Sequence, residues 1–195
     1  LGLIHPPLDP ITQTFEFDLD GEVWTLHGTL SDLRADGLVC WSFRTARAQD
    51  YLSGWITHLF LCACDATLAT APKLKETSWY SRDGIYRLRT VVNPKSIMAQ
   101  LIALYRTGLS EPLHFYPRSA WALANTGKIT EALKTWQCTR NHPFGESADP
   151  AYQLALRGVN NPIGPQFAEL ALQIYQPLLD HLEDARLTDL EVTSP

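Results

Sequence analysis

Three Asp-Gly pairs divide the first half of the chain, and they constrain the fold more than any other feature of the sequence. They stand at Asp20-Gly21, Asp36-Gly37 and Asp83-Gly84. Each lies between stretches of strand character, and an Asp-Gly pair in that setting is the strongest local signal for a two-residue hairpin turn. We therefore expect hairpins at all three places.

The first two turns predict a three-stranded meander. Residues 15–19 and 24–30 alternate apolar and polar side chains, as a strand with one buried face does. Residues 38–43 are more continuously apolar, which is typical of a central strand. The third turn predicts a second hairpin, in which residues 76–80 pair with 85–92.

Helices are predicted around and after the second hairpin. A helix over residues 48–66 is indicated by apolar side chains at helical spacing, and another begins at Pro94, a favoured first residue. Further helices are expected at 129–137, 151–156 and 167–181, between breaks at proline and glycine. We expect one α/β (α+β) domain over residues 1–195, in which a mixed sheet with hairpins and flanking helices (1–110) carries a helical C-terminal annex (111–195).

Composition narrows the class of protein. The chain starts at Leu1 and its one methionine is Met98, so we expect a fragment of a longer protein. No apolar run reaches the ~20 residues of a membrane span, and no signal peptide is recognisable. Four cysteines in 195 residues indicate reduced thiols and a cytoplasmic location. The net charge of -5 is uneven, because six lysines and arginines stand against two acids between Lys73 and Lys95.

Common catalytic and binding motifs are absent from the sequence. It contains no phosphate-binding glycine loop and no Gly-x-Ser-x-Gly elbow. A partial zinc site from Cys138, His142 and one cysteine of the Cys62/Cys64 pair is a weak alternative to buried thiols. Residues 18–22 imitate the start of a calcium loop, but a hairpin turn explains them better. We expect no cofactor and no metal in this chain.

Residues 26–63 resemble the RecC C-terminal domain family. The family's Leu-x-Gly strand and tryptophan-bearing strand match 26–28 and 38–41. Its Trp-x-x-His-Leu helix before Cys-Ala matches Trp55, His58, Leu59 and Cys62-Ala63. Residues 112–120 resemble its proline-bounded start of a helix. These motifs are typical of packing rather than of catalysis.

The resemblance implies a restriction-endonuclease-like core, that of the PD-(D/E)xK nucleases. Such enzymes hold Mg²⁺ with an aspartate that ends a Gly-x-x-Asp strand and with an acidic-x-Lys pair on the next strand. Here Ser31 stands at the first position, and Cys40 and Ser42 stand in the approximate register of the pair. Asp32 is one residue late, which in a strand means the opposite face. We expect no catalytic residue in this fragment.

The resemblance also implies a role in a larger assembly. The family is the C-terminal domain of the gamma subunit of exodeoxyribonuclease V, a helicase-nuclease of double-strand-break repair and recombination in which RecC joins RecB and RecD. There the domain contacts RecD and helps to separate and route DNA strands. On this view the basic hairpin is our candidate for a DNA or partner contact, through Lys73, Lys75, Trp79, Tyr80, Arg82, Arg87 and Arg89.

Three alternatives stay open at this point. The basic hairpin can be a solvated edge with Trp79 facing the core. The chain can be a divergent nuclease that binds metal through Asp32, Asp18 or Glu16. It can also be a binding module outside the family.

Overall fold

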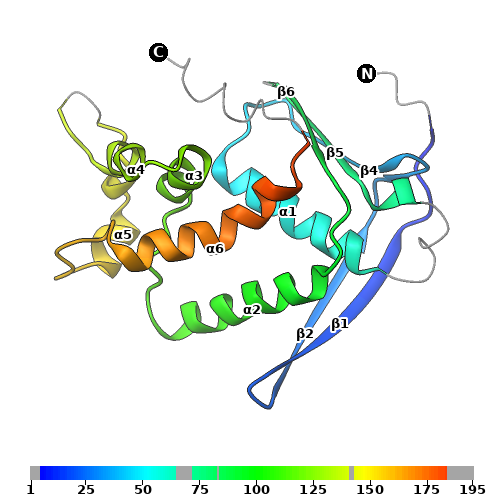
Figure 1. Ribbon diagram of the computed structural model, residues 1–195, viewed down its shortest axis with the longest axis horizontal. Helices are drawn as coiled ribbons and strands as arrows, with labels where there is room; N and C mark the ends of the chain where they lie inside the picture. Colours follow the sequence, from blue (N-terminus) through cyan, green and yellow to red (C-terminus); the bar gives the residue numbers. More distant parts are fainter. Residues whose placement is uncertain (1–4, 65–71, 83, 141–142, 184–195) are drawn as a thin grey trace.

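The computed structural model describes residues 5–64, 72–82, 84–140 and 143–183. In it, the first Asp-Gly pair forms the tip of a long hairpin. β1 (Ile11–Leu19) pairs antiparallel with β2 (Glu22–Leu30) along its whole length. Asp20 and Gly21 have φ values of 57° and 84°, the left-handed conformations that a tight hairpin turn requires. The hairpin projects past the neighbouring helix (Figure 1) and forms a two-stranded sheet of its own.

The other strands form a four-stranded mixed sheet in the order β3-β4-β5-β6. Its strands are β3 (Leu33–Arg34), β4 (Gly37–Trp41), β5 (Thr77–Ser81) and β6 (Gly84–Leu88). β4 runs parallel to β5, whereas the other pairs are antiparallel. The expected mixed sheet with hairpins and flanking helices is therefore confirmed.

The expected three-stranded meander is wrong. The second Asp-Gly turn joins β4 to the two-residue strand β3, and β2 pairs with β1 alone among the described strands. Between β2 and β3 the chain leaves the strand conformation at residues 31–32. β4 carries three buried residues in succession, as a strand between two neighbours does, and β5 supplies the second neighbour.

α1 (Ala48–Ala63) makes the crossover from β4 to β5 and covers one face of the sheet (Figure 1). Its apolar stripe is fully buried at Trp55 and Leu59. The helix ends three residues earlier than expected, because Cys64 adopts an extended conformation. The third hairpin is confirmed, but β6 stops at Leu88 rather than at 92, since the amide of Arg89 donates to the carbonyl of His181, 2.9 Å away.

The remaining helices are α2 (Pro94–Ser110), α3 (Pro117–Thr126), α4 (Ile129–Trp136), α5 (Pro150–Ala155) and α6 (Pro165–His181). Two short 3-10 turns accompany them, η1 (Pro72–Lys75) and η2 (Glu146–Ala148). The helices expected at 94, 129–137, 151–156 and 167–181 are confirmed to within two residues. In the described part of the chain, no helix has the length and apolar character that a membrane crossing demands.

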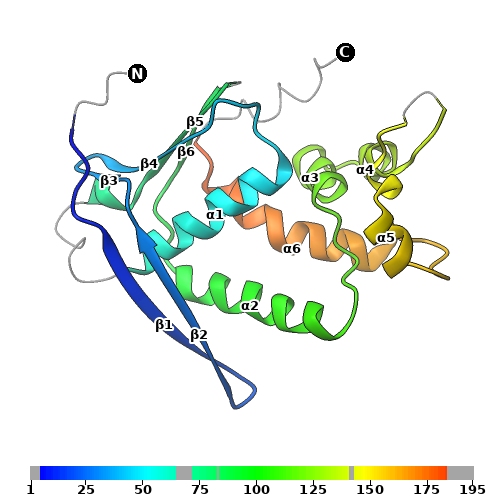
Figure 2. The ribbon, with the colours of Figure 1, turned by 180° about the vertical axis from the view of Figure 1, so that it is seen from behind.

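α6 lies between α2 and α3 and connects the annex to the sheet (Figure 2). Tyr175 on α6 donates its hydroxyl to the carbonyl of Ala48 at the start of α1, 3.1 Å away.

Glu146 is 5 % exposed and caps the first turn of α3. Its carboxylate accepts from the amides of Arg118 and Ser119 and from the Ser119 hydroxyl, at 2.8–3.1 Å. Buried side chains from the sheet and the annex belong to one core cluster.

Candidate functional site

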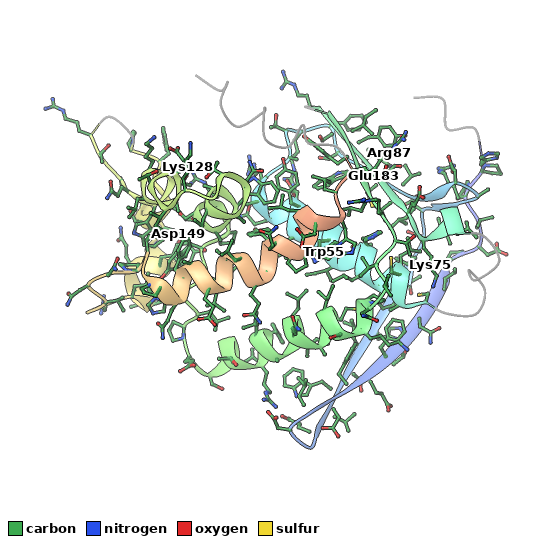
Figure 3. All side chains as sticks on the ribbon, in the orientation of Figure 1. Trp55, Lys75, Arg87, Lys128, Asp149 and Glu183 are labelled. Atoms are coloured by element: carbon green, nitrogen blue, oxygen red, sulfur yellow. The ribbon has the colours of Figure 1, made fainter. Side chains whose placement is uncertain are left out.

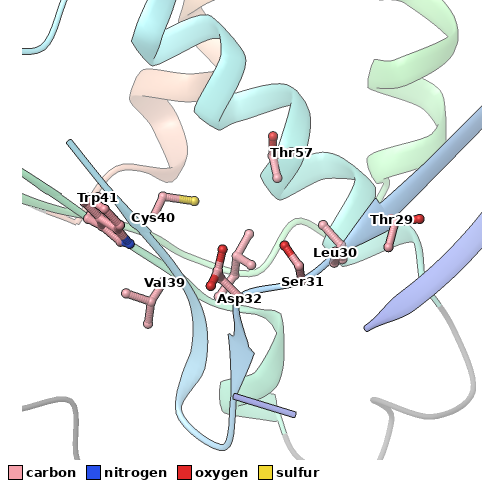
Figure 4. A pocket seen from close by; sticks show the side chains of 9 residues that line it. Thr29, Leu30, Ser31, Asp32, Val39, Cys40, Trp41 and Thr57 are labelled. Atoms are coloured by element: carbon pink, nitrogen blue, oxygen red, sulfur yellow. The ribbon is translucent and has the colours of Figure 1, made fainter. Parts of the chain in front are cut away.

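An open pocket of about 350 Å³ lies where β2 ends, between the edge of β4 and α1 (Figure 4). Its lining comes from the end of β2, the two residues after it, β4 and one residue of α1. The lining residues are Thr29, Leu30, Ser31, Asp32, Leu38, Val39, Cys40, Trp41 and Thr57. This is the place where the sequence led us to expect a degenerate nuclease site.

Two of the three positions singled out for that site meet in this pocket. Ser31 follows the end of β2, and Cys40 on β4 directs its thiol toward the α1 side (Figure 4). Ser42 is not among the lining residues. β4 ends at Trp41, and the amide of Ser42 donates to the carbonyl of Tyr80, 2.8 Å away. Ser42 therefore lies outside the strand and outside this pocket, although the sequence had set it in one register with Cys40.

Asp32 also lines the pocket, which corrects its placement on the opposite face. The rule that successive side chains alternate applies inside a strand, but Asp32 lies in the short irregular segment between β2 and β3. Its negative charge contributes to the raised pKa of the Cys40 thiol. Thr57 of α1 also lines the pocket, and the sequence did not predict this. The prediction used the alternation of side chains along strands, which says nothing about which helical residues face a strand.

The chemistry of the pocket does not match that of a magnesium-dependent nuclease. Burial, with a smaller contribution from Asp32, raises the pKa of the Cys40 thiol to about 11, so the sulfur is protonated at neutral pH. A protonated thiol is neither a nucleophile nor a metal ligand. Asp32 is the one carboxylate among the lining residues, and no lysine accompanies it. The residues present do not fit the carboxylate pair and lysine that such a metal site needs.

The other acids considered as displaced ligands lie at the far end of the hairpin. Ile11 pairs with Leu30 at its base, whereas Asp18 pairs with Val23 next to the turn. Seven residues of strand separate Asp18 from the base, a distance of ~23 Å at ~3.3 Å per residue. Asp18 instead accepts from the amide of Gly21 at 2.8 Å, which confirms the turn interpretation of residues 18–22. Glu16 points outward from the same strand and is exposed.

The Trp-x-x-His-Leu residues form a buried polar link rather than a catalytic group. His58 is fully buried and stacks on Trp55, with ring centroids 5.7 Å apart. Its Nδ1 lies 2.8 Å from the Thr77 hydroxyl, and its Nε2 lies 2.9 Å from the carbonyl of Arg89. Burial lowers the pKa of His58 to about 4, against a smaller upward effect of the bond to Arg89. The neutral ring thus joins α1 to β5 and to the segment after β6.

Three of the basic-hairpin residues contact neighbouring elements, although Arg89 among them is exposed. Lys75 donates to the carbonyl of Cys62 at the end of α1, 3.3 Å away. Arg89 donates to the carbonyl of Asp180 at 2.9 Å and so holds the end of α6. Trp79 packs against Tyr51 of α1, with ring centroids 5.6 Å apart, so it faces the core as the alternative interpretation had it.

Arg82 and Arg87 are exposed, and Tyr80 is half-buried. Lys73 lies in η1. Figure 3 labels Lys75, next to the end of α1, and Arg87, whose carbonyl accepts from the amide of Glu183, 2.9 Å away. The candidate contact residues whose side chains the structure describes therefore do not form one continuous basic surface.

The cysteines weighed for a zinc site do not meet one another. Cys62 and Cys64 are buried at the end of α1, whereas Cys138 is exposed after α4 and donates to the carbonyl of Pro143. His142 lies outside the described residues. Within the described ranges, no three histidine, cysteine or acidic side chains gather as a metal site would require.

Comparison with known families gives a match over most of the chain. The sequence is similar to the RecC C-terminal domain over residues 3–128. The matched region contains both sheets, the pocket and the buried His58 link, and it ends after α3. No curated protein matches the chain.

Proposed function

Because this chain belongs to the RecC C-terminal domain family, we propose that it is a non-catalytic domain of the RecC subunit of exodeoxyribonuclease V. In this role it supports contacts with RecB and RecD and helps to route the separated DNA strands, in a cytoplasmic complex. Its four free cysteines are consistent with a reducing compartment. The β3–β6 sheet with α1 is, in this proposal, the counterpart of a restriction-endonuclease-like core, since a mixed sheet is joined there by a parallel β4-α1-β5 crossover.

One observation carries the non-catalytic part of this proposal. The pocket at the end of β2 offers a serine, a protonated thiol and a single carboxylate where a nuclease of this fold needs two carboxylates and a lysine. The conspicuous histidine of the family pattern is fully buried and has both ring nitrogens engaged. Neither the protonated Cys40 thiol nor the buried, neutral His58 ring is available to activate water.

A second function has one observation in its favour. Asp32 lies in the pocket with Ser31, so the pocket is where a divergent nuclease would bind its metal ion through Asp32. Asp18 and Glu16 are too distant to join it, and no other lining residue carries a charge. A lone carboxylate holds magnesium weakly, because sites of this kind share the ion between carboxylates and substrate phosphates.

Two measurements test the proposal and its rival. RecC that carries this domain should co-purify with RecB and RecD, and removal of residues 1–195 from the subunit should weaken that association. The chain alone, incubated with linear duplex or single-stranded DNA and Mg²⁺, should cleave neither. Cleavage that disappears in Asp32→Ala but persists in the hairpin variant Asp18→Asn would establish the divergent nuclease instead.

A further inference from the structure

The mixed sheet presents a second face that no described helix covers. Strand pairing aligns Leu38, Thr77 and Leu88 in one row and Cys40, Trp79 and Tyr86 in another, and both rows face α1. Because side chains alternate along strands, the rows between them face away from α1. These outward rows are Val39, Ser78 and Arg87, and Trp41, Tyr80 and Ile85.

The outward face is rich in exposed aromatic and apolar surface. Trp41 is 59 % exposed, Ile85 is 48 % exposed, and Phe43 just beyond β4 is 85 % exposed. The rings of Trp41 and Phe43 meet edge to face with centroids 5.0 Å apart. Large aromatic side chains are rarely left this accessible without a partner, and several together on one face mark a binding surface. We call Trp41, Phe43 and Tyr80 the outer aromatic row. Ile85 lies beside Tyr80 on the neighbouring strand.

Arginines border the outer aromatic row. Arg87 stands on β6 in the adjacent outward row, and Arg82 follows the end of β5; both are exposed. Within the described residues, neither guanidinium is paired with a carboxylate, although the backbone of Glu183 bonds to that of Arg87. Arg44, by contrast, is held by Asp50 at 2.6 Å. The face therefore combines stacking surface with positive charge that no described carboxylate pairs.

We propose that this outward face binds single-stranded DNA, whose bases stack on Trp41 and Tyr80 while its phosphates bind Arg82 and Arg87. Trp41 and Tyr80 are paired neighbours on β4 and β5, the two central strands of the sheet. Aromatic side chains on adjacent central strands offer a flat platform on which unpaired bases stack, and flanking arginines bind the backbone without reading sequence. The inference rests on the proposed function, because it assigns the strand-routing role to one surface.

The experiment measures binding of the 195-residue chain to a fluorescein-labelled 15-nucleotide oligo(dT) by anisotropy in low salt. Trp41→Ala should weaken binding about tenfold, because loss of one stacked base costs about 5- to 150-fold. Arg87→Ala should weaken it and reduce the salt dependence by about one phosphate contact. Phe144→Ala, which removes an aromatic side chain 77 % exposed in the annex, and Arg157→Ala are matched controls and should bind like the wild type.

Several results would overturn the inference. Absence of binding in low salt would do so, as would binding that Trp41→Ala leaves unchanged. If Trp41→Ala abolishes association with RecB and RecD while oligo(dT) binding persists, the face is a protein interface. A wild-type chain that binds oligo(dT) through Trp41 but fails to associate with RecB and RecD would contradict the proposed function and not this inference. Equal circular dichroism of all variants shows that they are folded.

Discussion

Protonation of His58 should couple the stability of this domain to pH. The ring is fully buried, stacks on Trp55 and bonds to Thr77 and to the carbonyl of Arg89. Burial favours its neutral form and lowers its pKa from 6.5 to about 4 in the folded chain. In the unfolded chain the ring is in water and titrates near 6.5. The unfolded state therefore binds the proton first as the pH falls.

The sign and size of the effect follow from this difference. The full stability is present above pH 6.5 and is lost as the pH falls toward 4, because the unfolded state gains protons over that range. A shift of about 2.5 pKa units corresponds to about 3 kcal/mol at ~1.4 kcal/mol per unit. Roughly 1.4 kcal/mol of this should already be lost between pH 7.5 and 5.5, before most carboxylates titrate.

Urea unfolding followed by tryptophan fluorescence at pH 7.5 and 5.5 measures the loss. The wild type should lose roughly 1.4 kcal/mol more than His58→Gln between these pH values, since the variant has no group to protonate there. His27→Gln is the matched control, because His27 is exposed on β2 and bonds to Thr14 alone among the described residues. Its unfolding free energy should depend on pH as in the wild type.

Two results would refute this reasoning. One is a wild-type loss within ~0.3 kcal/mol of the loss in His58→Gln, which would mean that the folded ring takes up its proton over the same pH range as the unfolded ring. The other is a His58 ring resonance that titrates with a pKa near 6.5 in the NMR spectrum of the folded wild type. The NMR measurement needs no variant, so it stands even if His58→Gln does not fold.

Three further predictions concern packing and anchoring. Gly28→Ala should lower the free energy of unfolding, measured in urea, by ~1–3 kcal/mol, because its Cβ would lie 2.9 Å from the buried ring of Phe60. Thr29→Ala, at the neighbouring exposed position, should lower it far less. An equal loss in both variants would contradict the contact. Glu146→Gln should cost ~1–3 kcal/mol through weaker bonds to the start of α3, whereas Glu131→Gln on α4 should change stability by under ~0.5 kcal/mol. Arg106→Ala should speed amide exchange at the hairpin tip, because Arg106 donates to the carbonyl of Leu19 at 2.8 Å; unchanged exchange there would show that this anchor is dispensable.

Local signals in the sequence predict most of the elements but not their partners. Asp20-Gly21 marks its hairpin because both residues can adopt positive φ, and Pro94 marks the start of α2 because it favours the first turn. The predicted meander is wrong because β4 pairs with β5 across the α1 crossover. The paired residues, such as Leu38 and Thr77, lie 39 positions apart in the sequence. No periodicity within β2 or β4 reports which strand lies beside them.

The pocket was predictable in part, for a related reason. Ser31 and Cys40 line one pocket, as the sequence led us to expect, because each lies in or next to a regular strand. Asp32 was misplaced because two irregular residues between β2 and β3 cancel the alternation rule, and Ser42 because β4 ends one residue before it. The outer aromatic row becomes visible only when the strand order sets Trp41 beside Tyr80.

Metal binding at the pocket is the most direct test of the proposed non-catalytic role of this domain. The 195-residue chain should be titrated with Mn²⁺, as a magnesium substitute, and free ion followed by electron paramagnetic resonance. With Asp32 as the single carboxylate and Cys40 protonated, we expect no stoichiometric binding at submillimolar Mn²⁺ and no difference between the wild type and Asp32→Ala. One tightly bound Mn²⁺ per chain that Asp32→Ala removes would contradict the account.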